Sequence, residues 1–130
     1  MRSEEKRALS RARLEHAEQC LLSAKALVEA GDFRGAANRS YYAVFHAMRA
    51  VLALDEIDMK RHSGIISEFR RLYVKPGIFS TELSEIISLL FDARSASDYD
   101  DFYIVSKAEV AEQVENAAIF LQAVKVYLTA

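Results

Sequence analysis

Apolar residues recur every three or four positions along most of this chain. This spacing places them on one face of a helix, and that face must pack against other helices. The 130 residues include only four glycines and one proline, so long helices can form without a break. With 52% apolar residues, the chain can bury a core without disulfides or metal ions. These features predict an all-α protein.

The apolar spacing predicts an up-down bundle of five helices, three long and two short, in one domain over residues 1–130. Local signals mark the ends of these helices. Gly31 supplies a stop, Asp32 is a plausible N-cap, and Ser106 with Glu109 forms a capping box. The expected helices are Ser3–Ala30, Phe33–Leu54, His62–Tyr73, one after Ser80 or Thr81 with Leu83–Leu90 as its apolar stripe, and one after Ser106. A turn at Pro76-Gly77 ends the third of them.

The segment from Arg94 to Val105 is predicted to be a long connection between the last two helices. It contains no glycine or proline, but it carries three aspartates and three aromatic residues. Long connections in compact domains are often functional. The alternative is that Tyr99, Phe102 and Tyr103 close the open end of the bundle while the aspartates stay in water.

The second predicted helix carries a polar stripe beside its apolar face. The seven-residue step from Arg39 to His46 turns the helix by roughly 700°, so the two side chains lie nearly in register. Tyr42 lies three residues from Arg39 and four from His46, within reach of both, and Arg49 extends the stripe. Such a stripe is expected to meet a partner helix, a second subunit or a ligand.

Two structural interpretations compete with a functional role for this stripe. His46 could fill a helix–helix or dimer contact. Arg39 could form a salt bridge, with Asp98 or Asp101 as its partner. Functionally, arginine binds phosphate in a fork, and histidine titrates near neutral pH and can move protons.

Charge and cysteine content limit the classes of function. A net charge of −2 argues against sequence-blind binding of duplex nucleic acid. The single cysteine, Cys20, and the densely charged stretch from Met1 to Glu18 indicate a cytoplasmic protein without a signal peptide or membrane span. We interpret Cys20 as an inert core thiol. His16, His46 and His62 show no metal-ligand spacing with each other or with Cys20, so we expect neither a metal nor a cofactor.

Several motifs, in their order along the chain, resemble those of the HEPN superfamily, and most closely its small stand-alone prokaryotic members. The resemblance covers nearly the whole chain and is carried by Arg39-Ser40-Tyr41-Tyr42-Ala43-Val44-Phe45-His46-Ala47, His62-Ser63-Gly64, Phe69, Arg94 and Asp98-Tyr99-Asp100-Asp101-Phe102. It implies a helical bundle that homodimerises, with polar motif residues in a cleft between subunits. It also implies a minimal nucleotidyltransferase partner in a two-component or toxin–antitoxin pair.

Many HEPN proteins are metal-independent endoribonucleases in which four to six residues separate an arginine from a histidine. Arg39 and His46 fit this spacing, although the family's motif usually lies near the start of the last long helix. Arg94 is nearer that position, but Asp98-Tyr99 stands where a histidine is expected.

We therefore rank a non-enzymatic binding module first, a homodimer that engages the nucleotidyltransferase partner, nucleotide or RNA. An endoribonuclease toxin with Arg39 and His46 as catalytic residues ranks second, and a purely structural dimer third. The expected binding residues are Arg39, Tyr42, His46, Arg49, Arg94, Asp98 and Tyr99.

Overall fold

The computed structural model describes residues 3–130, so the first two residues of the predicted domain and of its charged N-terminal stretch lie outside the described residues. Within this range the chain forms five α-helices and no β-strand, which confirms the all-α prediction. The helices are α1 (Ser3–Ala30), α2 (Phe33–Leu52), α3 (His62–Phe69), α4 (Thr81–Tyr99) and α5 (Lys107–Thr129). A 3₁₀ turn, η1 (Ala53–Asp55), extends α2, and a π-helical turn, η2 (Arg70–Val74), extends α3.

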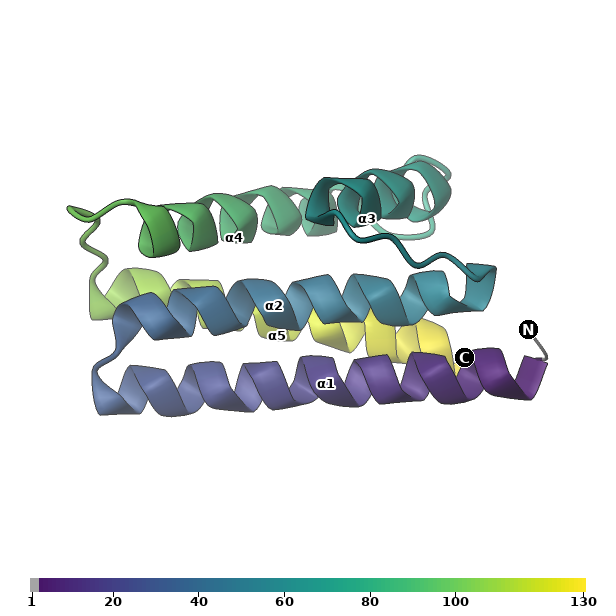
Figure 1. Ribbon diagram of the computed structural model, residues 1–130, viewed down its shortest axis with the longest axis horizontal. Coiled ribbons are helices and arrows are strands. Elements are labelled where there is room, and N and C mark those ends of the chain that lie inside the picture. Colours follow the sequence, from purple (N-terminus) through teal and green to yellow (C-terminus); the bar gives the residue numbers. More distant parts are fainter. Residues whose placement is uncertain (1–2) are drawn as a thin grey trace.

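The four longer helices lie along the long axis of the molecule, and each runs opposite to the one before it (Figure 1). The short α3 lies at the end where α2 finishes and α4 begins. α2 is the central helix because it packs against α1, α3, α4 and α5. A side chain on α2 can therefore meet residues from any of the other helices.

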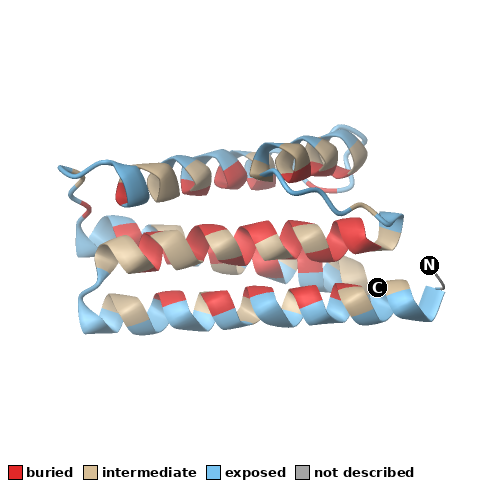
Figure 2. Ribbon diagram, in the orientation of Figure 1, coloured by how far each residue is buried: buried red, intermediate tan, exposed pale blue. Residues whose placement is uncertain are grey.

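Burial follows this central position, and α2 is buried over most of its length (Figure 2). Of the core positions predicted on this helix, the structure buries Ala37, Tyr41, Val44, Met48 and Val51. Phe33, the first residue of α2, is only half-buried. It packs against a small second core near the α1–α2 turn, which includes Val105 and Val110.

The predicted helix ends are confirmed where they depend on local signals. Gly31 ends α1 with a φ of 82°. This left-handed backbone conformation favours glycine. The Asp32 side chain then accepts a hydrogen bond from the Gly35 backbone N–H at the start of α2. Ser80 caps α4, and Ser106 with Glu109 forms the predicted capping box of α5.

The predicted long connection from Arg94 to Val105 is wrong over its first half. α4 continues through Arg94 to Tyr99, so four helices are long and only α3 is short. The connection to α5 is limited to residues 100–106. The segment contains no helix breaker, and its buried Ser97 packs toward α2, where Arg34 contacts its carbonyl. Tertiary contacts therefore extend the helix beyond its apolar stripe.

The aromatic residues of this region do not close the bundle as the alternative interpretation expected. The exposed fractions of Tyr99 and Phe102 are 75% and 91%, and Ile104 is 89% exposed. Only Tyr103 is half-buried, packed against the small core at the α1–α2 turn. The structure thus leaves a short exposed aromatic segment between α4 and α5.

Candidate functional site

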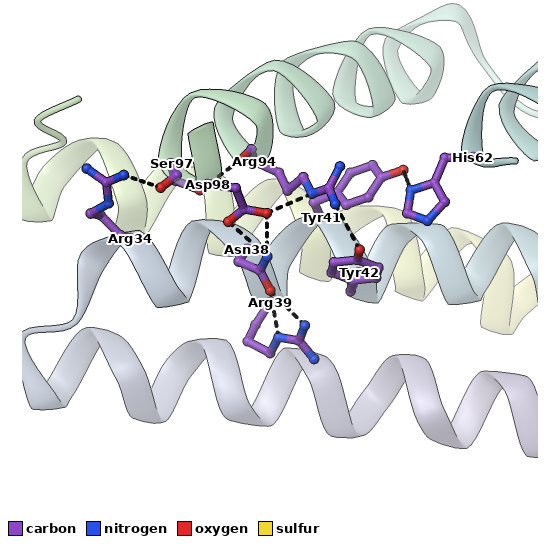
Figure 3. A network of polar contacts seen from close by, with 9 residues as sticks. All are labelled: Arg34, Asn38, Arg39, Tyr41, Tyr42, His62, Arg94, Ser97 and Asp98. Carbon is purple, nitrogen blue, oxygen red and sulfur yellow. Dashed lines mark hydrogen bonds and ion pairs between the residues drawn. The ribbon is translucent and has the colours of Figure 1, made fainter. Parts of the chain in front are cut away.

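Tyr42, half-buried on α2, is the centre of the polar cluster. The Arg94 guanidinium on α4 donates a hydrogen bond from Nη2 to the Tyr42 hydroxyl, across 3.1 Å (Figure 3). The Arg39 guanidinium lies over the same ring, with its Cζ 4.9 Å from the ring centre. The Arg94 Cζ is 5.5 Å from that centre. Two cations from two helices therefore share one aromatic ring.

Asp98 and Asn38 connect the two arginines. The Arg94 Nε lies 3.0 Å from an Asp98 carboxylate oxygen, as an ion pair one helical turn apart on α4. The Asn38 side-chain amide donates to both Asp98 oxygens, at 3.1 and 3.0 Å. The Asn38 carbonyl oxygen then accepts from the Arg39 Nε and Nη2, at 3.0 and 2.7 Å. Figure 3 shows this continuous chain of contacts between α4 and α2.

The proposed salt bridge from Arg39 to Asp98 or Asp101 is thus replaced by a contact through Asn38. Arg94, not Arg39, carries the ion pair with Asp98. The Arg39 guanidinium is held by a neutral amide oxygen, and within residues 3–130 it forms no ion pair with a carboxylate. This difference matters because an arginine without a carboxylate partner remains ready to bind an anion.

His46 lies on the other side of Tyr42, with the two ring centres 6.0 Å apart. It stacks on His16 of α1, at 3.9 Å between ring centres, and its Nδ1 is 3.3 Å from the Arg49 Nη1. Burial, followed by the charges of His16, Arg49, Arg39 and His62, lowers the pKa of His46 to about 4. The imidazole is therefore neutral at neutral pH.

His62, at the start of α3, contacts the cluster through Tyr41 and Tyr42 of α2. Its Nδ1 is 2.9 Å from the Tyr41 hydroxyl, and its ring stacks on Phe45 with 4.1 Å between centres. Burial and then the Arg94 charge lower the pKa of His62, and burial raises the pKa of Tyr41. These contacts make His62 part of the packing between α2 and α3.

All seven residues predicted to bind ligand belong to one connected group. Tyr42 links Arg39, Arg94 and His46, and Arg94 also contacts Asp98. Arg49 joins through His46, and the Tyr99 ring lies 5.6 Å from the Arg94 Cζ.

Sequence reasoning missed four residues that complete this group: His16, Arg34, Asn38 and His62. Asn38 directly precedes Arg39, and its side chain could have been suspected from that position alone. Arg34 donates to the carbonyl oxygens of Ser97, Asp100 and Tyr103, and so caps the end of α4. Figure 3 shows the contact with Ser97. No sequence signal links Arg34 to carbonyl groups more than 60 positions away.

Two of the histidines and the cysteine lie close together in the structure, although we found no metal-ligand spacing among them in the sequence. The ligand atoms of His16, Cys20 and His46 all lie within 4.8 Å of one another. His16 and Cys20 are one turn apart on α1, a spacing that could have indicated a shared face. Only the packing of α1 against α2 adds His46.

Across residues 3–130, none of the helices has the length and apolar character needed to cross a membrane.

The fold and the cluster define a class of protein: an up-down helical bundle with arginine, tyrosine and histidine gathered on its central helix. The HEPN domain family matches this chain over residues 10–127, so the chain belongs to the HEPN family.

Relatives in this family support the same assignment. The chain is 31% identical to a "UPF0332 protein" of Thermotoga maritima over 109 residues, which cover 84% of this chain and 83% of the relative. It is 31% identical to "Putative toxin MJ0142" of Methanocaldococcus jannaschii over 115 residues, covering 88% and 78% of the two chains. The chain is also 35% identical to "Putative toxin MJ0605" of Methanocaldococcus jannaschii over 86 residues, which cover 66% of this chain and 64% of the relative.

Proposed function

We propose that this HEPN protein is the toxin-type component of a cytoplasmic two-component system, and that the cluster around Tyr42 binds a phosphate-bearing ligand, either nucleotide or RNA. Two relatives that carry toxin in their names support the first part. The observation that carries the second part is the convergence of Arg39 and Arg94 on one tyrosine ring.

Arg39 is the residue best suited to hold a phosphate. Its guanidinium is only partly buried, and its hydrogen-bond partner is a neutral amide oxygen. A phosphate oxygen is a stronger acceptor than that amide and can replace it on the guanidinium fork. Asp98 partly neutralises Arg94, so Arg94 positions the Tyr42 hydroxyl and supplies less charge.

Tyr99 offers a surface for a nucleobase. It is the last residue of α4, it is 75% exposed, and its ring lies close to the Arg94 guanidinium. An exposed aromatic ring next to a cation is the usual arrangement for stacking an unpaired base. A single-stranded ligand could therefore place its phosphate at Arg39 and stack a base on Tyr99.

Membership of the HEPN family is the support for two further parts of this proposal. One is a homodimer in which the cluster faces a second subunit. The other is a partner of the minimal nucleotidyltransferase type. Both fit a toxin–antitoxin pair, and two relatives carry the word toxin in their names.

Endoribonuclease activity is the second candidate, favoured by the spacing of Arg39 and His46, which fits the nuclease motif of the HEPN family. Cleavage through the ribose 2′-hydroxyl needs a group that exchanges protons near the working pH. With a pKa of about 4, roughly one His46 in 1,000 is protonated at pH 7, which makes it a poor general acid. A purely structural dimer comes third, because among residues 3–130 no carboxylate pairs with Arg39 to explain its charge.

A thermal-shift and calorimetric titration with adenine nucleotides and a short single-stranded RNA tests the binding proposal. We expect ligand to raise the melting temperature of the parent protein and to bind Arg39→Ala at least about tenfold more weakly. Arg71→Ala is the matched control, because Arg71 is an exposed arginine of η2 that pairs with Glu68 of α3. Equal binding by Arg39→Ala and the parent, or no binding by either, would refute the proposal.

Catalysis is tested separately, by incubating labelled RNA with the protein in the presence of a chelator. We expect intact RNA with the parent protein. Cleavage that is abolished in a folded His46→Ala variant would instead favour the nuclease.

A further inference from the structure

We propose that His16, Cys20 and His46 form a binding site for one thiophilic divalent cation of the Zn²⁺ type. This site does not depend on the proposed phosphate-binding function. It is built from one thiol and two imidazoles, a donor set that suits Zn²⁺ in proteins. The three ligand atoms lie within 4.8 Å of one another, and they come from facing surfaces of α1 and α2.

The fold brings these donors close to coordination distance. Zn–N bonds of about 2.0–2.1 Å and a Zn–S bond of about 2.3 Å put neighbouring ligand atoms of a tetrahedral site roughly 3.5 Å apart. The observed separations need only a modest contraction. His16 can provide it, because its side chain is exposed, while Cys20, also on α1, is buried in the core.

The two imidazole rings already lie next to each other. The His16 and His46 rings are stacked, with 3.9 Å between centres and 19° between planes. The His16 ring must turn out of this stack for one nitrogen of each ring to face a common centre, and its exposed side leaves room for that turn. The exposed side of His16 leaves a fourth position for water, as in zinc sites with three protein ligands.

The charged groups around the site include one that offsets the metal charge, the Cys20 thiolate, and two arginines close to the ligands. Binding replaces the S–H bond of Cys20 by a metal–sulfur bond, and the proton leaves to the solvent. The resulting thiolate cancels one of the two metal charges. The Arg39 Nη1, 4.0 Å from the sulfur, favours the thiolate but repels the ion. Arg49 opposes the metal, because it contacts His46 at 3.3 Å. The Asp58 Oδ1 lies 3.6 Å from the Arg49 Nη2, so Asp58 can hold the Arg49 guanidinium in an ion pair when the metal ion binds.

Cobalt is the spectroscopic probe for this site. Tag-free protein, freed of metal with a chelator, is titrated with Co²⁺ and then with Zn²⁺. We expect one ion per chain, a thiolate-to-cobalt charge-transfer absorption, release of one proton, and displacement of Co²⁺ by Zn²⁺. The absence of the charge-transfer absorption in the parent protein would overturn the proposal.

Three variants identify the ligands. Cys20→Ser should lose the charge-transfer absorption, and His16→Gln should bind Zn²⁺ at least about tenfold more weakly. His62→Gln is the matched control, because it makes the same substitution at the one histidine that is not a proposed metal ligand. It should bind Zn²⁺ within about twofold of the parent.

His16 is exposed, so His16→Gln should keep its fold, checked by circular dichroism, even if the buried Cys20→Ser variant does not. Binding by His16→Gln equal to the parent, or equal losses in His16→Gln and His62→Gln, would overturn the site. Neither result bears on the Arg39→Ala titration, which is run in the presence of a chelator.

Discussion

Arg94 on α4 reaches across to α2 and donates a hydrogen bond to the hydroxyl of Tyr42, with 3.1 Å between the two heavy atoms. These residues are 52 positions apart, and their contact joins the two halves of the cluster. On one side are Asp98 and Asn38, and on the other is His46. The bond therefore determines the orientation of the tyrosine ring on which both arginines lie.

Removing the hydroxyl alone tests this bond. Tyr42→Phe keeps the ring but leaves Arg94 without one of its acceptors, so we expect a loss of about 1 kcal/mol in the free energy of unfolding. Urea denaturation followed by circular dichroism measures it. Tyr99→Phe is the control, because its ring is exposed, and it should change stability by less than about 0.5 kcal/mol. Equal effects of the two variants would argue against the bond.

Asp98 is expected to stabilise the contact between α4 and α2. Asp98→Asn removes the carboxylate that pairs with Arg94 and accepts two contacts from Asn38. We expect a loss of about 1 kcal/mol in the free energy of unfolding, reduced at high salt because the pair is partly exposed. Asp101→Asn, in the exposed turn after α4, should have little effect. A loss that does not depend on salt would contradict the ionic explanation.

Arg34 is expected to hold the end of α4 in place. Its guanidinium donates to the carbonyl oxygens of three residues in and after the last turn of that helix. Arg34→Ala should therefore destabilise the protein by about 2 kcal/mol, since hydrogen bonds from a charged donor are the stronger ones. Hydrogen exchange should become faster at residues 99–105 in particular. Arg11→Ala, on the exposed face of α1, should leave that exchange unchanged.

Acid should destabilise the metal-free protein through its half-buried histidines, His46 and His62. The pKa of His46 is lowered from 6.5 to about 4, so below pH about 6.5 the unfolded chain binds a proton that the folded chain does not. Stability is therefore fully present above that pH and falls as the pH is lowered toward 4. His62, whose pKa is also lowered, adds to the same loss.

Urea denaturation across this pH range, with a chelator present, measures the effect. His46→Gln removes the group that must remain neutral, so its free energy of unfolding should fall less steeply with acid than that of the parent. An identical slope in parent and variant would show that other groups control the acid sensitivity.

Local features of the chain were enough to predict the helices and most of their ends. The apolar spacing places five helices correctly because a helix face repeats every three to four residues. Gly31 and the Ser106–Glu109 pair mark ends reliably, because a left-handed glycine and a capping box need only neighbouring residues. The stripe of Arg39, Tyr42 and His46 could be predicted for the same reason.

Tertiary structure decided how these pieces are used. Arg94 lies in a helix and not in a loop, because α4 continues along α2. Arg34 of α2 donates a hydrogen bond to a carbonyl oxygen in the last turn of α4. Asn38 takes the place expected for Asp98 beside Arg39, and His46 meets His16 and Cys20 only through the packing of α1 on α2. Periodicity along a chain defines which face a residue occupies, but the distance between two faces depends on how whole helices pack. The sequence alone therefore determined the helices and the polar stripe, and packing determined the partners of each charged side chain.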